Sequence, residues 1–225
     1  MSDQDRFELR TFGRDLGAIA DALCRLATPG PRETSREAYL LRRGDLHHNL
    51  KARRGRLELK TLVETRNGLQ RWHPEASVEL PGGLNDDGEP VQPSTSGAAR
   101  EPLPAVLVEL LGPALRTEPG TEPQLPPDLA ALAERIAGMS GRAAVHVVKG
   151  RRRLPLTDVR GELVEITANG ATLESIAIEA EDANALHDFA GQVGLADAEN
   201  VSYVLALHRL LGWEPLPAGS PDRAW

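Results

Sequence analysis

The sequence predicts an α+β fold: a closed, antiparallel β-barrel of eight strands that encloses a tunnel, with helices packed on its outside. Eight segments of the 225-residue chain have the lengths and residue types of strands. In five of them charged and apolar residues alternate, which places the charges on one face and the apolar side chains on the other. If the sheet closes, the charged faces line a lumen and helices cover the apolar faces.

The expected elements follow the apolar spacing and the turn residues along the chain. Strands are predicted at residues 7–12, 37–44, 46–54, 56–65, 69–80, 143–154, 158–168 and 172–181. Helices are predicted at residues 15–26, 103–116, 127–138, 182–193 and 200–211. Asp182 and Asn200 stand where the last two helices would be capped. The single cysteine, Cys24, is expected to be a small core residue of the first helix.

Length and composition indicate one domain over residues 1–225. Residues 81–127 contain ten of the 17 prolines, so a Pro- and Gly-rich flexible insert is expected at about 82–102, and a short tail at 214–225. No apolar run approaches the roughly 20 residues that cross a bilayer, and the start of the chain is charged. We therefore expect a cytoplasmic protein without a membrane partner. The oligomeric state stays open, with a homodimer as one alternative.

Charge is divided unevenly along the chain. The formal net charge is −7, yet residues 42–60 hold seven basic and two acidic residues, and residues 142–160 hold six basic and one acidic. Residues 161–207 contain no Lys or Arg and nine Asp or Glu. The net charge argues against a protein that coats polyanions generically, whereas a lumen with cationic walls would concentrate and orient a polyanion.

The residue types on the charged faces favour phosphate and divalent cations as ligands. Arginine grips phosphate oxygens with two parallel hydrogen bonds, and lysine adds a compact charge. Carboxylates beside them would repel a polyanion unless Mg²⁺ or Mn²⁺ bridged the two, since these ions take carboxylate and phosphate oxygens together. Such an ion would also activate water for hydrolysis.

Five motifs, in this order along the chain, resemble those of the triphosphate tunnel metalloenzymes, the superfamily that includes the CYTH domains of class IV adenylate cyclases and thiamine triphosphatases. The opening segment Arg6-Phe-Glu8-Leu-Arg10 is similar to the family's Glu-x-Glu-x-Lys strand. The hairpin at 49–60, the basic segment Lys149-Gly-Arg151-Arg-Arg153 and the closing Glu179-Ala-Glu181 resemble its later strands. Val201-Ser202-Tyr203 resembles the start of its last helix.

The chain departs from the family pattern at three positions. Arg6 stands in place of the first Glu of the opening motif, Arg10 in place of its Lys, and Asn169 before Gly170 where relatives tend to carry Asp. Fewer carboxylates weaken a divalent site, so phosphate binding is better supported than catalysis.

The resemblance implies a function and a role for each candidate residue. We expect a metal-dependent hydrolase of a linear triphosphate, which would be tripolyphosphate, thiamine triphosphate or a nucleoside triphosphate, with Mg²⁺ or Mn²⁺ as cofactor. The expected catalytic and metal-binding residues are Glu8, Glu179 and Glu181, with Glu58, Glu162 and Glu165 as helpers. The expected phosphate-binding residues are Arg10, Lys51, Arg53, Lys60, Lys149, Arg151 and Arg153.

Three alternatives remain open from the sequence. The first is a catalytically weak or inert CYTH-like module that binds polyphosphate or a phosphorylated ligand. The second is a class IV-like adenylate cyclase, which would use the same site. The third, nucleic-acid binding, ranks last because single-strand binders stack bases on aromatic rings and the aromatic content is only 4%.

Overall fold

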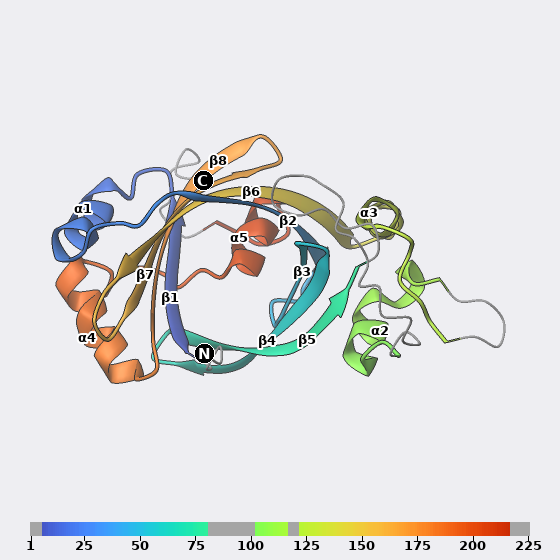
Figure 1. Cartoon of the computed structure of the whole chain (residues 1–225), viewed down its shortest axis with the longest axis horizontal. Helices are drawn as coiled ribbons and strands as arrows, with labels where there is room; N and C mark the ends of the chain where they lie inside the picture. Colours follow the sequence, from blue (N-terminus) through green and yellow to red (C-terminus); the bar gives the residue numbers. More distant parts are fainter. Residues whose placement is uncertain (1–5, 81–101, 117–121, 217–225) are drawn as a thin grey trace. The chain divides into compact units, whose positions relative to one another are not determined.

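A computed structural model of the chain, which describes residues 6–80, 102–116 and 122–216, shows eight strands closed into a barrel (Figure 1). Their order around the barrel is β1-β5-β4-β3-β2-β6-β7-β8. The strands are β1 (Phe7–Gly13), β2 (Glu33–Arg42), β3 (His48–Arg53), β4 (Arg56–Arg66), β5 (Leu69–Glu79), β6 (Arg142–Pro155), β7 (Arg160–Ala168) and β8 (Ala171–Ala180). The predicted α+β barrel is therefore confirmed.

Helices form at each position where helical spacing predicts them. They are α1 (Gly17–Leu26), α2 (Ala105–Leu111) with the 3-10 turn Gly112–Ala114, α3 (Leu129–Ala137), α4 (Ala183–Val193) and α5 (Tyr203–Leu210). The side chain of Asp182 accepts hydrogen bonds from the backbone N–H groups at positions 184 and 185, so the predicted cap of α4 is confirmed. Among the helices described, none is long and apolar enough to span a membrane.

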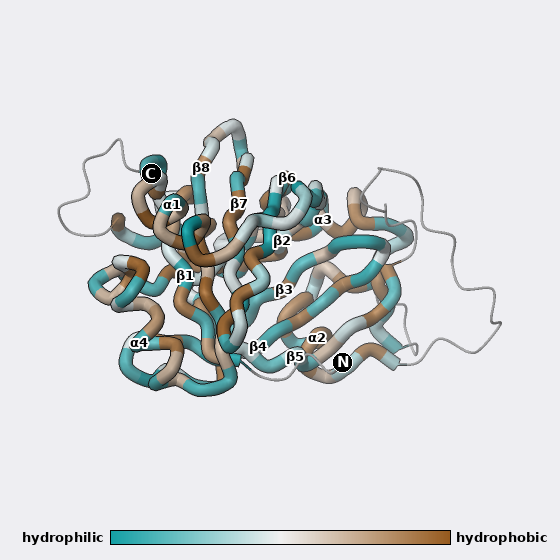
Figure 2. The backbone as a smooth tube through the Cα atoms, turned by 60° about the vertical axis from the view of Figure 1, so that its left-hand side comes forward, coloured by the Kyte–Doolittle hydropathy of each residue, from teal (hydrophilic) through white to brown (hydrophobic). Residues whose placement is uncertain are grey.

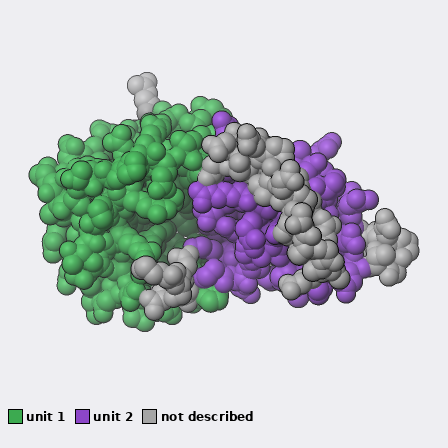
Figure 3. All heavy atoms as spheres, viewed as in Figure 1, with its two compact units in different colours: residues 1–35, 61–73, 147–225 green, residues 36–60, 74–146 purple. Residues whose placement is uncertain are grey.

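The chain divides into two compact units, coloured separately in Figure 3. Unit 1 comprises residues 1–35, 61–73 and 147–225, and unit 2 comprises residues 36–60 and 74–146. The strands β1, β7 and β8 belong to unit 1 and β3 to unit 2, whereas β2, β4, β5 and β6 each contain residues of both. The single domain over 1–225 stays a prediction, and each unit is described by itself below.

In unit 1 the strands have an apolar face covered by α1 and α4. Phe7 and Leu9 of β1 and Ile178 of β8 pack in one buried cluster with Leu23 of α1 and Leu186 of α4. The helix α5 lies against the other face of these strands: the ring of its Tyr203 meets Phe12 edge-on at 5.1 Å, and the N–H of Val201 donates to the carbonyl of Arg10 at 2.6 Å. Unit 1 therefore holds β1 between helices on both sides.

Unit 2 has the same division into an apolar and a polar face. Leu50 of β3 and Leu57 and Leu59 of β4 are buried with Leu107 of α2 and Leu132 of α3. The residues between them along the strands are polar, and the alternation is visible as teal and brown bands along β3 and β4 (Figure 2). Because side chains of a strand alternate between faces, this pattern commits the charged residues to the face away from the helices.

Three predictions about these elements need correction. Cys24 is exposed rather than part of the core, because the buried residue of α1 is its neighbour Leu23 and consecutive helical positions point in different directions. Asn200 does not cap α5, because Ser202 takes that role by accepting a hydrogen bond from the N–H of Leu205. The second strand begins at Glu33 rather than at residue 37. Of the predicted insert and tail, residues 82–101 and 217–225 lie outside the described residues.

Asn200 instead connects three backbone segments of unit 1. Its Oδ1 accepts a hydrogen bond from the N–H of Arg10 at 2.9 Å. Its Nδ2 donates to the carbonyl oxygens of Glu8 and Gly68, each at 2.8 Å. The side chain thus links β1 to the turn between β4 and β5 and to the segment that leads into α5.

We expect Asn200→Ala to lower the free energy of unfolding by about 1–3 kcal/mol, because three backbone groups lose a hydrogen-bond partner. Urea denaturation measures the change. The matched control is Asn184→Ala, since this asparagine is exposed on α4 and only its backbone N–H takes part in the cap. Equal stability of the two variants would show that Asn200 does not hold these segments together.

Candidate phosphate-binding site

The polar face of unit 1 carries a cluster of charged residues around Arg10, which we call the unit 1 cluster: Glu8, Arg10, Glu162, Ser175 and Glu179. Strand register brings them together. Glu8 of β1 lies opposite Glu179 of β8. Ala177 of β8 lies opposite both Arg10 of β1 and Glu162 of β7. Directly opposed residues share a face of the sheet, so three strands contribute to one cluster.

Arg10 lies at the centre of the unit 1 cluster and is only 4% exposed. Its guanidinium donates to both carboxylate oxygens of Glu8 at 3.2 and 3.1 Å, and to Glu162 Oε1 at 3.2 and 3.3 Å. It also donates to Ser175 Oγ at 3.2 Å. Burial is the largest single influence and acts to lower the pKa of Arg10, but the charges of Glu8, Tyr203 and Glu162 and the hydrogen bonds to Glu8 together outweigh it, and the pKa lies well above its ordinary value. Arg10 therefore stays charged and fully engaged with the carboxylates.

Tyr203 of α5 supplies an aromatic surface for two cations of unit 1. Its ring centroid lies 4.7 Å from the guanidinium carbon of Arg10 and 3.6 Å from Lys149 Nζ. Cation–π contacts of this kind compensate part of the cost of burying a charge. Lys149, which is 7% exposed, is therefore held at the buried end of the basic segment of β6.

The carboxyl of Glu179 is the member of the cluster most affected by its surroundings. Burial raises its pKa, and the nearby carboxylate of Glu8 raises it further, to about 7 against an ordinary value of 4.5. Arg10 acts in the opposite direction. Two carboxyls facing each other across β1 and β8 favour a shared proton, so near neutral pH Glu179 is partly protonated and hydrogen-bonded to Glu8.

Two other predicted acidic residues lie elsewhere. Glu181 pairs with Arg6 at 2.9 Å, and its side chain is 61% exposed. Glu165 lies on the other face of β7 from Glu162, because the two are three residues apart, and it pairs with Arg32 at 2.7 Å. The unit 1 cluster thus contains Glu8, Glu162 and Glu179 from the predicted acidic set, but neither Glu165 nor Glu181.

The carboxylates of the unit 1 cluster do not fit the predicted Mg²⁺ or Mn²⁺ site as they are arranged. Arg10 donates to Glu8 and Glu162, and Glu179 is hydrogen-bonded to Glu8, so the oxygens that would face an ion already face donors. Glu181 faces Arg6. Within residues 6–80, 102–116 and 122–216, no group of three or more His, Cys, Asp or Glu side chains is placed to hold a metal.

A row of three cations follows the polar face of β6: Lys149, Arg151 and Arg153. Arg151 donates to Glu33 at 2.7 Å and to Glu162 at 3.4 Å, and Arg153 lies 3.5 Å from Glu33. Side-chain exposure rises from Arg151, at 23%, to Arg153, at 65%. With about 3.3 Å per residue, the row spans roughly 13 Å from the buried to the open end.

Unit 2 carries a second cluster on its own polar face, which we call the unit 2 cluster: Glu37, Tyr39, Lys51, Arg53 and Glu58. Glu37, 5% exposed, accepts a hydrogen bond from the hydroxyl of Tyr39 at 2.9 Å and lies 3.5 Å from Lys51 Nζ. Arg53 lies 3.8 Å from Glu37 and donates to Glu58 at 2.8 Å. Three of the predicted residues therefore meet in this unit around a carboxylate that was not predicted.

Burial dominates the electrostatics of the unit 2 cluster. It lowers the pKa of Lys51, with smaller contributions from the neighbouring charges of Arg53 and Lys60, while Glu37 acts to raise it. Burial also acts to lower the pKa of Arg53, but the charge and hydrogen bond of Glu58, with the charges of Glu37 and Tyr39, together outweigh it and the pKa is raised. Lys51 is thus the cation whose charge depends most on its carboxylate partner.

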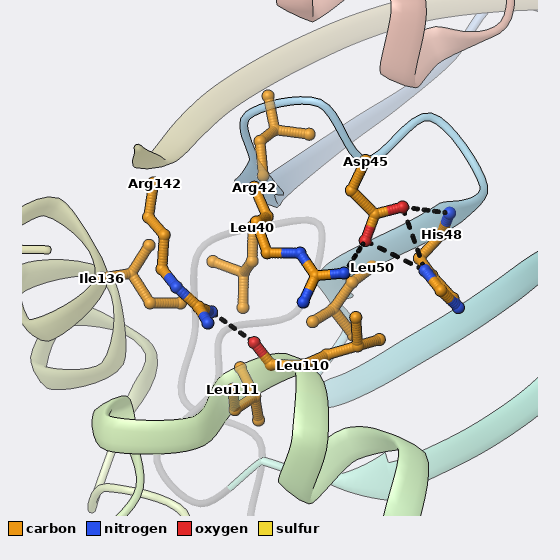
Figure 4. Close-up of a pocket in the computed structure, with 10 residues that line it drawn as sticks. Leu40, Arg42, Asp45, His48, Leu50, Leu110, Leu111, Ile136 and Arg142 are labelled. Carbon is orange, nitrogen blue, oxygen red and sulfur yellow. Dashed lines mark hydrogen bonds and ion pairs between the residues drawn. The ribbon is translucent and has the colours of Figure 1, made fainter. Parts of the chain in front are cut away.

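A small pocket of unit 2 lies on the apolar side, between Leu50, α2 and α3 (Figure 4). Asp45 bonds both Arg42 and the Nδ1 of His48 at 3.0 Å, and Arg142 donates to the carbonyl of Leu110. Burial acts to raise the pKa of Asp45, but the hydrogen bond from His48 and its charge lower it. Each of the four polar side chains shown makes at least one contact within the chain, which is typical of a structural role.

The sequence analysis missed three residues of β2 that contact or pair with the basic side chains: Glu33, Glu37 and Tyr39. The signal was present, because all three share the parity of one strand face and alternate with Ala38 and Leu40. Starting the strand at residue 37 hid half of the alternation. Tyr203, in contrast, belongs to a motif that the resemblance had singled out.

We expect Glu179→Gln to remove part of the pH dependence of stability. Because the pKa is about 7 in the folded chain and lower when unfolded, Glu179 stabilises the fold fully at acidic pH, and this contribution is lost as the pH rises through about 7. The unfolding free energy of the wild type should fall more between pH 5 and pH 8 than that of the variant, by about 1–3 kcal/mol. Glu165→Gln, which changes an exposed carboxylate, is the control. If the unfolding free energy of all three proteins depended on pH in the same way, Glu179 would not share a proton with Glu8.

We expect Glu37→Gln to destabilise the protein by about 3 kcal/mol, because it leaves the buried charge of Lys51 without its carboxylate. Glu33→Gln removes a half-exposed partner and should cost less than about 1 kcal/mol. Chemical denaturation at neutral pH compares the two. A cost for Glu37→Gln no larger than that of Glu33→Gln would mean that Glu37 does not compensate Lys51.

Comparisons with known proteins return structural likenesses only. No family profile and no curated protein matches the chain. A structure from Pyrococcus horikoshii OT3 is 18% identical, covers 88% of this chain and 97% of that one, and has a TM-score of 0.46. A candidate adenylate cyclase from Bacillus halodurans is 10% identical, covers 89% and 96%, and has a TM-score of 0.47. A candidate adenylyl cyclase from Hippeastrum, described as having a dominant triphosphatase activity, is 13% identical, covers 94% and 98%, and has a TM-score of 0.45.

Proposed function

We propose that the protein is a CYTH-like barrel that binds a linear triphosphate or polyphosphate on the polar face of unit 1. The observation that carries the proposal is the row Lys149, Arg151 and Arg153 on one face of β6. A row of roughly 13 Å suits an extended anion with several phosphate groups better than a single phosphate. Arginine at two of the three positions adds paired hydrogen bonds to each phosphate.

The carboxylate that Arg151 and Arg153 share can be exchanged for phosphate at little cost. Arg151 and Arg153 share Glu33, whose side chain is 43% exposed. Ion pairs with such exposed carboxylates contribute about 0–1 kcal/mol, so a phosphate can replace Glu33. Lys149 Nζ lies over the ring of Tyr203, which fixes the buried end of the row.

Arg10 has a different position from the row. Its hydrogen bonds to Glu8 and Glu162 are partly buried and its own side chain is only 5% exposed, so breaking these charge pairs is costly. Contact between Arg10 and phosphate remains a sequence-based proposal. The same holds for Lys60, and for Lys51 and Arg53 of the unit 2 cluster, which we treat as a separate binding surface and test separately.

Turnover of the bound triphosphate is the finer proposal, and one assay separates its forms. Purified protein is incubated with tripolyphosphate, thiamine triphosphate or ATP, each with Mg²⁺, Mn²⁺ or EDTA. Metal-dependent release of phosphate would identify the hydrolase, and release of pyrophosphate from ATP the cyclase. Binding without release would identify the inert module.

We expect Arg151→Gln to raise the Kd for tripolyphosphate about tenfold or more, since a charge-assisted contact of 1.5–3 kcal/mol is lost and each 1.4 kcal/mol is a factor of ten. Isothermal titration calorimetry measures it. Arg152→Gln is the matched control, because Arg152 is exposed and lies opposite Leu163 on the other face of β6. The Kd of this variant for tripolyphosphate should stay within about twofold of the wild-type value. Arg53→Gln, in the same titration, tests unit 2.

Two results would contradict the proposal. The first is no heat of binding with tripolyphosphate at any metal concentration. The second is an equal loss in Arg151→Gln and Arg152→Gln, which would indicate a diffuse charge effect. A tighter, steeply salt-dependent affinity for a single-stranded oligonucleotide would favour nucleic-acid binding instead.

A further inference from the structure

The carboxylates of the unit 1 cluster face a cation that belongs to the chain itself. Arg10 makes five hydrogen bonds, of which two go to Glu8, two to Glu162 and one to Ser175. Its side chain is 5% exposed, so water has little access to the charge. A guanidinium has five N–H donors in a fixed plane and stays charged, so it can donate hydrogen bonds to several carboxylates at once.

The carboxyl groups near Arg10 come from three strands of unit 1. Glu8 and Glu162 come from different strands, β1 and β7, and Glu179 of β8 lies opposite Glu8. The side chains of Glu8 and Glu162 are each about one-fifth exposed. Three carboxyl groups on three adjacent strands would repel one another without a central positive charge.

The position of Arg10 is also fixed from outside the carboxylates. Its backbone N–H donates to Asn200 Oδ1, its carbonyl accepts from the N–H of Val201, and the ring of Tyr203 covers its guanidinium. The segment before α5 therefore holds both the backbone and the charge of this residue. Such support limits how far the side chain can swing away to admit another cation.

We propose that Arg10 is the resident cation of the unit 1 cluster and excludes a divalent metal from it, and that removing its charge converts Glu8, Glu162 and Glu179 into a metal site. The inference concerns the cation alone and holds whether or not the row on β6 binds phosphate. It follows from hard divalent ions preferring carboxylate oxygens, and from those oxygens being occupied here by guanidinium donors.

The test uses Mn²⁺ as the only ligand, on the full chain. Wild type, Arg10→Met and Arg10→Gln are titrated, with loss of the electron paramagnetic resonance signal of aqueous Mn²⁺ as the readout. We expect both variants to gain one site that binds at least tenfold more tightly than any site of the wild type. Adding Glu162→Gln to Arg10→Met should abolish the gain. Arg209→Met, which removes an arginine paired with the single carboxylate of Glu199, should gain nothing.

Thermal unfolding in the same buffers covers the case in which the variants are too unstable to titrate. A ligand that binds only the folded chain stabilises it, so Mn²⁺ should raise the Tm of Arg10→Met and Arg10→Gln but not that of the wild type. The proposal is overturned if the wild type binds Mn²⁺ as tightly as the variants through Glu162. It is equally overturned if neither variant gains Mn²⁺ binding or Mn²⁺-dependent stability.

Discussion

The compensation of buried charge is the constraint on which this protein depends. Alternation along the strands sends every second side chain to the face opposite the buried apolar clusters, and on β1, β6 and β7 many of these are charged. Removing a charge from water costs free energy unless an opposite charge or a hydrogen bond compensates it. The charge of Arg10 is paired with Glu8 and Glu162, and the charge of Lys51 is paired with Glu37. The arrangement of the polar faces follows from satisfying these pairs.

The two units meet this constraint in the same way. Each buries a cation beside an acidic side chain and places a tyrosine ring near it: Tyr203 by Arg10 and Lys149 in unit 1, and Tyr39 by Lys51 in unit 2. The tyrosines come from different elements, a helix and a strand. The recurrence therefore reflects the physical chemistry of buried cations, for which an aromatic face and a carboxylate are complementary partners.

The periodicity of the sequence was sufficient to predict the strands, the helices and which residues share a face, because side-chain direction in a strand depends only on parity. It could not predict partners. The hydrogen bonds from Arg10 to Glu162 and from Arg151 to Glu33 join residues 152 and 118 positions apart, and these distances are set by strand order and register. Asn200 was expected to cap a helix, since its residue type suits both roles, and only the approach of β1 shows which one it takes.

The pairing of the first strand with the last has a consequence for biosynthesis. β1 pairs with β8, and the carboxylate of Glu162 is made 152 residues after Arg10. During translation, β1 therefore leaves the ribosome with one edge unpaired and its cation lacking a principal partner. Closing such a long stretch of chain is slow relative to forming local contacts. Pairing of β1 with β8 must wait until residue 180 has been made, so until then the nascent chain exposes an edge that other chains or a chaperone can bind.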